Sequence, residues 1–198
     1  MSPFSNVSAL SQKIVQCAKA EWARDIHEAP GSNWMRIREY LKTLRMSTAK
    51  TYMHDGDAEW CGAFAGYIVV LAGVSPDLVA VKKRPEEGDL ASTYRMLCLA
   101  KKDHGLRYVS PEDTLPGDVC SFGRTGVKRP KEGEHIEVCI GVDEDSIETI
   151  GGNAYGTFPD GGTGQGVILR QRPRKATEFQ KGLVYSLRFQ PTDAVAGK

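Results

Sequence analysis

The chain has 198 residues, enough for one domain with a full hydrophobic core and too few for two ordinary domains without a visible linker. Hydrophobic residues make up 40% and charged residues 26%, and the net charge is +1, so no charge excess points to nucleic acid. We predict a single, monomeric domain over residues 1–198, with 191–198 as a frayed tail.

The first residues, 1–6, lack the basic and continuous apolar regions of a secretory signal, and no apolar run approaches the ~18 residues of a membrane span. We therefore expect a protein made in the cytoplasm without a signal peptide and with no membrane span. Its five cysteines are an odd number without a Cys-x-x-Cys pair, which argues against a disulfide framework and a zinc site. They are Cys17, Cys61, Cys98, Cys120 and Cys139.

Two amphipathic helices are predicted first. Apolar residues recur at three- and four-residue steps from Val7 to Trp22, and Pro30 and Gly31 mark the turn that follows. Ser32 or Asn33 can cap the second helix. Its apolar stripe consists of Ile37, Leu41 and Leu44.

The third predicted helix begins near Trp60-Cys61 and ends at Gly73, a residue that tolerates the left-handed conformation. Cys61 therefore lies in the first turn. There, the unpaired backbone N–H groups and the positive end of the helix dipole favour a thiolate and lower the thiol pKa. The alternative is an inert buried cysteine, since free cysteine is among the most buried residue types.

A fourth helix is predicted from Gly88 to Gly105, and after it the pattern changes to short strands. The predicted strands are 106–109, 118–122, 134–142, 146–150, 166–170 and 182–189. Four helices followed by five or six strands indicate an α+β fold with helices packed against an antiparallel sheet. The loop 124–132 carries four basic residues, for which a solvated surface is favoured over an anionic polymer site.

Among four histidines, His135 is the best partner for Cys61. His27 and His104 adjoin helix ends, and His54 lies in a loop before the Cys61 helix, where a surface position is favoured. Strand alternation places Ile136 and every second residue after it toward the core and leaves His135 on the other face, from which it can meet the Cys61 helix. Glu137 shares that face and is expected at the rim, with polarisation of the imidazole as the second possibility.

The hairpin after His135 suggests a third residue. If Asp143 to Asp145 form a three-residue loop, His135 lies opposite Asn153, whose amide could orient the imidazole. A two-residue loop would shift the register by one and turn Asn153 to the opposite face. Gly151 and Gly152 suit close approach of a ligand or backbone, and a bulge is the alternative.

Four motifs in this order resemble the CHAP family, the cysteine- and histidine-dependent amidohydrolases and peptidases. They are Trp60-Cys61, Pro116-Gly117-Asp118-Val119, Glu134-His135-Ile136 and Gly151-Gly152-Asn153. The stretch 28–33, with Ile37 and Tyr40-Leu41, is similar to a bacterial and phage subgroup. The resemblance runs from about residue 18 to 172 and implies a papain-like fold.

By this resemblance, Cys61 is the nucleophile, His135 the base and Asn153 the orienting residue, with no cofactor and no metal. Two departures stand out. Many family members carry Glu-x-Asn where this chain has Gly151-Gly152-Asn153, and a small residue where it has Glu137. Further substrate-cleft candidates are Trp60, for which a core position is equally expected, Glu137, Gly151 and Gly152.

The implied activity is hydrolysis of a peptidoglycan amide bond through a thioester, by an amidase or endopeptidase. Without a signal peptide, the enzyme would reach the periplasm or cell wall by phage lysis or as an injected antibacterial toxin. The toxin is favoured, and it would imply an immunity protein that occludes Cys61. Alternatives are a catalytically silent papain-like binding module and an acyltransferase.

Overall fold

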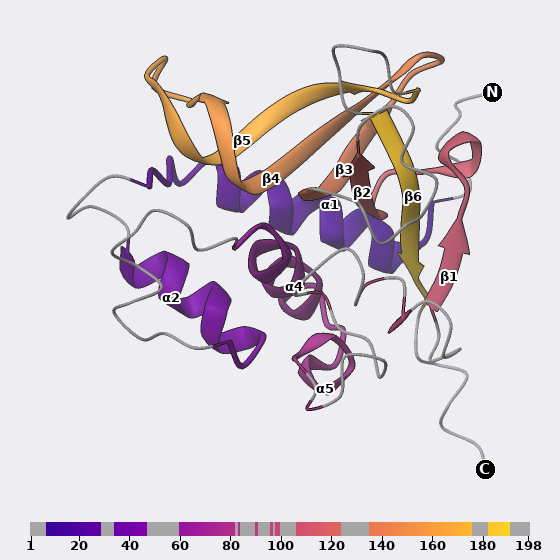
Figure 1. Ribbon diagram of the computed structural model, residues 1–198, viewed down its shortest axis with the longest axis horizontal. Helices are drawn as coiled ribbons and strands as arrows, with labels where there is room; N and C mark the ends of the chain where they lie inside the picture. The colour runs from indigo at the N-terminus through magenta and orange to yellow at the C-terminus, as the bar shows by residue number, and fades with distance from the viewer. Residues whose placement is uncertain are drawn as a thin grey trace.

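The computed structural model describes residues 7–28, 34–46, 60–81, 83, 90, 96, 98–99, 106–123, 135–175 and 182–190. Its N-terminal part is helical and its C-terminal part is a sheet, with the helices gathered on one side of the sheet (Figure 1). The helices are α1 (Ala9–Trp22), α2 (Trp34–Thr43), α4 (Cys61–Leu71) and the short α5 (Pro76–Val79). The predicted α+β class is confirmed.

In the described part of the chain, the sheet has six strands, all antiparallel, in the order β1-β6-β2-β3-β4-β5. They are β1 (Leu106–Val109), β2 (Val119–Gly123), β3 (His135–Val142), β4 (Ser146–Thr157), β5 (Thr163–Pro173) and β6 (Gly182–Phe189), with a 3-10 turn η2 (Pro111–Asp113) after β1. The hairpin strands β4 and β5 are longer than predicted. Their shared end is rich in glycine and polar residues, so it carries no apolar alternation that a sequence pattern could detect.

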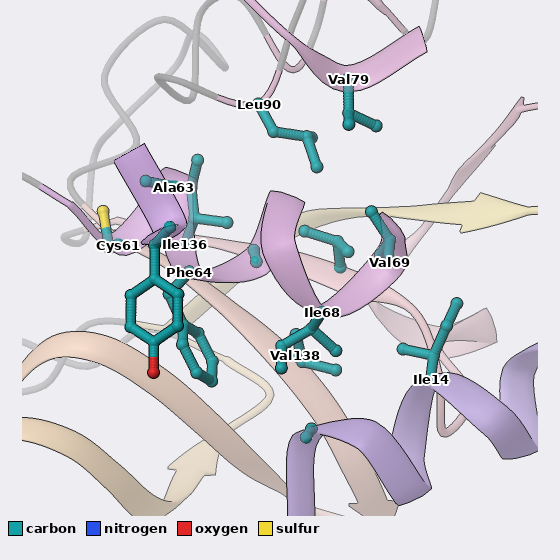
Figure 2. Close-up of a cluster of buried hydrophobic side chains, with 14 of the residues drawn as sticks. Ile14, Cys61, Ala63, Phe64, Ile68, Val69, Val79, Leu90, Ile136 and Val138 are labelled. Atoms are coloured by element: carbon teal, nitrogen blue, oxygen red, sulfur yellow. The ribbon is translucent and has the colours of Figure 1, made fainter. Parts of the chain in front are cut away.

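Helix α4 is the central helix, in contact with α1, α2, α5, β3 and β4. It is apolar on every side, as expected of a helix enclosed by protein. The predicted stop at Gly73 is confirmed: Gly73 has φ +113°, and the N–H of Val74 donates to Val69 O at 3.0 Å. In Figure 2, Cys61 and Ile14 lie at opposite ends of the buried cluster around this helix.

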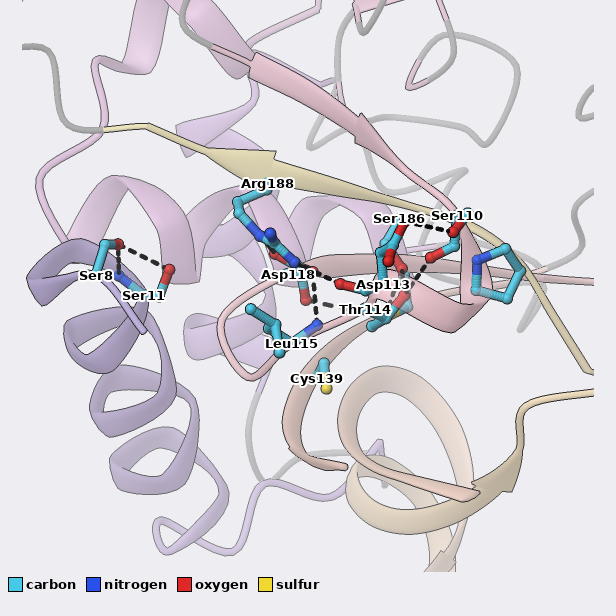
Figure 3. Close-up of polar contacts among 12 residues, drawn as sticks. Ser8, Ser11, Ser110, Asp113, Thr114, Leu115, Asp118, Cys139, Ser186 and Arg188 are labelled. Carbon is cyan, nitrogen blue, oxygen red and sulfur yellow. Dashed lines mark hydrogen bonds and ion pairs between the residues drawn. The ribbon is translucent and has the colours of Figure 1, made fainter. Parts of the chain in front are cut away.

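The Pro-Gly-Asp turn is a structural junction. Asp118 is fully buried; its Oδ2 accepts from the N–H of Leu115 at 2.9 Å, and both its oxygens accept from Arg188 on β6 at 2.8 Å (Figure 3). Gly117 has φ +94°, and a Cβ there would lie 2.6 Å from the Cα of Ser11. The turn therefore fixes β2 against α1, and only glycine fits its second position.

Gly117→Ala is expected to destabilise the protein by about 3 kcal/mol or more, because left-handed strain adds to a clash with the backbone of Ser11. Gly161→Ala is the matched control: Gly161 has φ +88°, but nothing lies within 4 Å of the point that a Cβ would occupy there, so strain alone should cost about 1 kcal/mol. Urea unfolding of both variants measures the difference. Equal losses would show that the contact with Ser11 relaxes freely.

Several expected features lie outside the described residues: Ser32 and Asn33, His54, His104, the loop 124–132 and the tail 191–198. Of the predicted fourth helix, Met96, Cys98 and Leu99 are helical and its other residues, apart from Leu90, are outside the described set. None of the helices in the described part of the chain has the length and hydropathy needed to traverse a bilayer.

Candidate active site

Cys61 is the first residue of α4. The first intrahelical bond runs from the N–H of Phe64 to Trp60 O at 2.9 Å, and Trp60 provides no side-chain cap. The N–H groups of residues 61 to 63 are thus the donors that a helix start leaves without intrahelical acceptors. Cys61 is 7% exposed as a whole residue and belongs to the buried core cluster.

His135 begins β3, opposite Phe122 of β2, and its side chain is 12% exposed. The imidazole lies close enough to the Cys61 thiol for the interaction to raise the pKa of His135. Its Nε2 lies 3.2 Å from Oε1 of Glu137, in an ion-pair contact whose angle is poor for a hydrogen bond. Since Nε2 faces the carboxylate, Nδ1 is the nitrogen left for the sulfur. The structure therefore brings Cys61 and His135 together although they are far apart in the sequence.

Glu137 is fully buried, so the expectation that it lies at the rim is wrong. Strand alternation does place it on the face of His135, but that face is covered here. Its Oε2 accepts from Thr149 Oγ1 at 2.5 Å, and its carboxylate also accepts from Arg172. Gly151 provides the room, since a Cβ there would lie 2.6 Å from Glu137 Cγ. Glu137 contacts the imidazole and, being fully buried, has no surface exposed to a substrate.

The two buried charges stabilise each other. Burial by itself would lower the pKa of His135, but the contacts with Cys61 and Glu137 outweigh it and raise the pKa to about 9. Burial would likewise raise the pKa of Glu137, yet the contacts with His135 and Arg172 hold it well below its usual range. At neutral pH, therefore, His135 is an imidazolium beside a carboxylate.

The β3–β4 hairpin differs from the prediction near its loop. The N–H of Asp143 donates to Ser146 O at 2.9 Å, so the loop has two residues, and Val142 pairs with Ile147. A bulge at Ile140 then absorbs the one-residue shift, and Val138 pairs with Ile150 as the three-residue loop had predicted. The shorter loop and the bulge thus cancel, and the predicted register holds at Val138, on the His135 side of the bulge.

Asn153 lies in a second irregularity, between the paired positions Gly151 and Ala154 of β4, with φ +54°. Its Oδ1 accepts a hydrogen bond from the side chain of Gln165 on β5. Among the described contacts of His135, the neighbouring acceptor is Glu137 and not Asn153. The structure therefore places a carboxylate from the same strand where the sequence had suggested an amide from the next one.

Trp60 and Gly152 belong to the core. Trp60 is fully buried, and its Nε1 donates to Glu28 Oε2 at 3.1 Å, so of its two expected positions the core is confirmed and the cleft wall is not. A Cβ on Gly152 would lie 2.4 Å from Trp60 Cζ3 and 2.6 Å from Phe64 Cβ. Gly151 and Gly152 thus allow close packing of protein on both faces of β4, and neither lines a substrate cleft.

One group could supply metal ligands within the described residues: Asp25, His27 and Asp160, whose ligand atoms come within 4.8 Å of one another. Each has a contact of its own. His27 Nε2 lies 3.1 Å from Asp25 Oδ2, its ring stacks on Phe158 at 3.6 Å, and Asp160 Oδ1 accepts from the N–H of Gly162. None of the three residues is Cys61 or His135 or contacts them in the described structure.

No family model, curated protein or solved structure matches the chain. The residue that sequence reasoning undervalued is Glu137. One signal could have found it: a carboxylate two places after His135, on the same strand face, opposite a glycine able to make room for it.

Proposed function

We propose that the chain is a cysteine-dependent amidohydrolase or peptidase with Cys61 as nucleophile and His135 as its acid–base partner. The observation that carries the proposal is the contact of Cys61, at the first position of a buried helix, with an imidazole backed by the buried Glu137. A nucleophile, a base and a third group that orients the base define such a site by geometry.

The charges suggest how the reaction proceeds. In the proposed reaction the nucleophile is the thiolate form of Cys61, beside the His135 imidazole. The thiolate attacks the amide carbonyl, and the N–H groups at the start of α4 are placed to stabilise the oxyanion. His135 donates its proton to the leaving amine, which leaves a thioester on Cys61. Neutral His135 then takes a proton from water as that water hydrolyses the thioester.

The CHAP resemblance suggests peptidoglycan as substrate, cut between the sugar and the first alanine or within its peptides. In this proposal the enzyme acts in the periplasm or cell wall as an injected toxin or a phage lysis enzyme. A toxin would be accompanied by an immunity protein that covers Cys61.

Digestion of purified peptidoglycan, followed by mass spectrometry of the released fragments, tests this proposal. We expect fragments with newly freed amines, and none after alkylation of the protein with iodoacetamide. Because Cys17 and Cys98 are partly exposed, the alkylation arm uses a protein in which both are alanine, so that the loss can be assigned to Cys61.

Absence of fragments from the untreated protein would contradict the proposal and favour a binding module. Fragments that persist after alkylation would exclude Cys61 as nucleophile. Products that carry an acceptor other than water would indicate acyl transfer.

A further inference from the structure

Arg172, on β5, holds Glu137 with two donors. Its Nε donates to Oε2 at 3.1 Å and its Nη2 donates to Oε1 at 2.5 Å. Oε1 is also the oxygen that lies 3.2 Å from His135 Nε2. The guanidinium therefore fixes the plane of the carboxylate that faces the imidazole, which is the geometric specificity of a bidentate arginine pair.

Arg172 is itself held in place. Its side chain is 16% exposed, and its guanidinium carbon lies 5.2 Å from the ring centroid of Phe122. Phe122 pairs with His135 in the β2–β3 ladder. Arg172 therefore packs on Phe122, the residue that pairs with His135. Arg172, Phe122 and His135 lie together on this face of the sheet.

Glu137 has little else to fix it. Thr149 contacts only Oε2, and Arg170 is more distant, with Nη1 at 3.7 Å from Oε1 and Nη2 bonded to the backbone oxygen of Tyr155. Without Arg172, the described polar contacts left to Glu137 on β4 and β5 would be the Thr149 hydroxyl and the more distant Arg170. We propose that Arg172 is a positioning residue that acts through Glu137 to keep a carboxylate against Nε2 of His135. This role extends the proposed function, and only its kinetic test depends on that function.

The test is an NMR titration of the His135 imidazole in wild type and Arg172→Gln. The groups that face the ring are Cys61 from α4 and Glu137 from its own strand, and Arg170 and Arg172 on β5 face Glu137. If Arg172 positions Glu137, the His135 pKa in the variant should be about one unit or more lower than in wild type. Burial lowers that pKa, and the displaced carboxylate would no longer counteract it. If Arg172 contributes only its positive charge, its removal should raise the midpoint. A raised or unchanged midpoint overturns the proposal.

Arg172→Lys separates charge from geometry, because lysine keeps the charge but cannot present the planar fork. Its midpoint should lie closer to that of Arg172→Gln than to wild type, and wild-type behaviour would overturn the bidentate role. This variant also decides the question should Arg172→Gln fail to fold.

Arg188→Gln is the matched control, since Arg188 makes a similar two-donor pair with the buried Asp118. It should weaken folding comparably and leave the His135 titration unchanged. A shift as large as that of Arg172→Gln would show a general loss of structure and overturn the proposal. On peptidoglycan, Arg172→Gln should lower kcat about tenfold or more with little change in KM. If peptidoglycan is not cleaved at all, the titration still decides the role of Arg172.

Discussion

Cys61→Ala should reduce fragment release from peptidoglycan by about a thousandfold or more, because the proposed thioester forms on the Cys61 sulfur, which alanine lacks. The fold should survive, since alanine suits a helix start adjoining packed residues. Initial rates at saturating substrate, together with a urea unfolding curve, measure the two effects separately.

Cys17→Ala is the control for Cys61→Ala. Cys17 is a partly exposed cysteine on α1 whose described interactions are with Lys13 and Glu21 of the same helix, and its replacement should leave the rate unchanged. A Cys61→Ala protein that is folded and retains more than a tenth of the wild-type rate would be incompatible with covalent catalysis at this position.

Glu137→Gln should have the second largest effect, and it should act on both rate and stability. The rate should fall by about a hundredfold to ten-thousandfold, as when a buried carboxylate that orients a catalytic histidine becomes an amide. The free energy of unfolding should fall by about 3 kcal/mol, because Arg172 and His135 lose the charge that compensates theirs. Rates and urea unfolding measure these losses.

The pH profile gives the same variant a sharper signature. In wild type, activity should fall as pH rises through about 9, where His135 loses the proton it must donate. In Glu137→Gln this limb should move to lower pH. Burial lowers the His135 pKa, and only the contact with Cys61 would remain to raise it. Glu148→Gln, an exposed glutamate on β4, should leave the limb in place. A limb that does not move in Glu137→Gln would separate Glu137 from the chemistry.

Local patterns were enough to predict the helix that carries Cys61 and the strand that begins at His135. Apolar content, a glycine at the helix end and period-two alternation are properties of adjacent residues, and the elements Cys61–Leu71 and His135–Val142 follow from them. The meeting of Cys61 and His135 was predicted from strand alternation and from the order of the four motifs, and the structure brings the two residues together.

The identity of the third group could not be predicted in the same way. It depends on whether the face that carries Glu137 is covered, and coverage is decided by Thr149 and Arg172, which lie on other strands. The loop length was also ambiguous, since a two-residue loop with a bulge and a three-residue loop give the same pairing at Ile150. Alternation assigns a residue to a face but does not say what lies above that face.

The adjacent glycines of β4, Gly151 and Gly152, let side chains approach the backbone closely on both faces of the sheet. On one face the side chain of Glu137 packs on Gly151, and on the other Trp60, the residue before Cys61, packs on Gly152. A single peptide unit therefore separates the Glu137 carboxylate from the start of α4. A displacement of that peptide would move both Glu137, which contacts His135, and Trp60, which precedes Cys61. The relative position of His135 and Cys61 therefore depends on this one peptide unit.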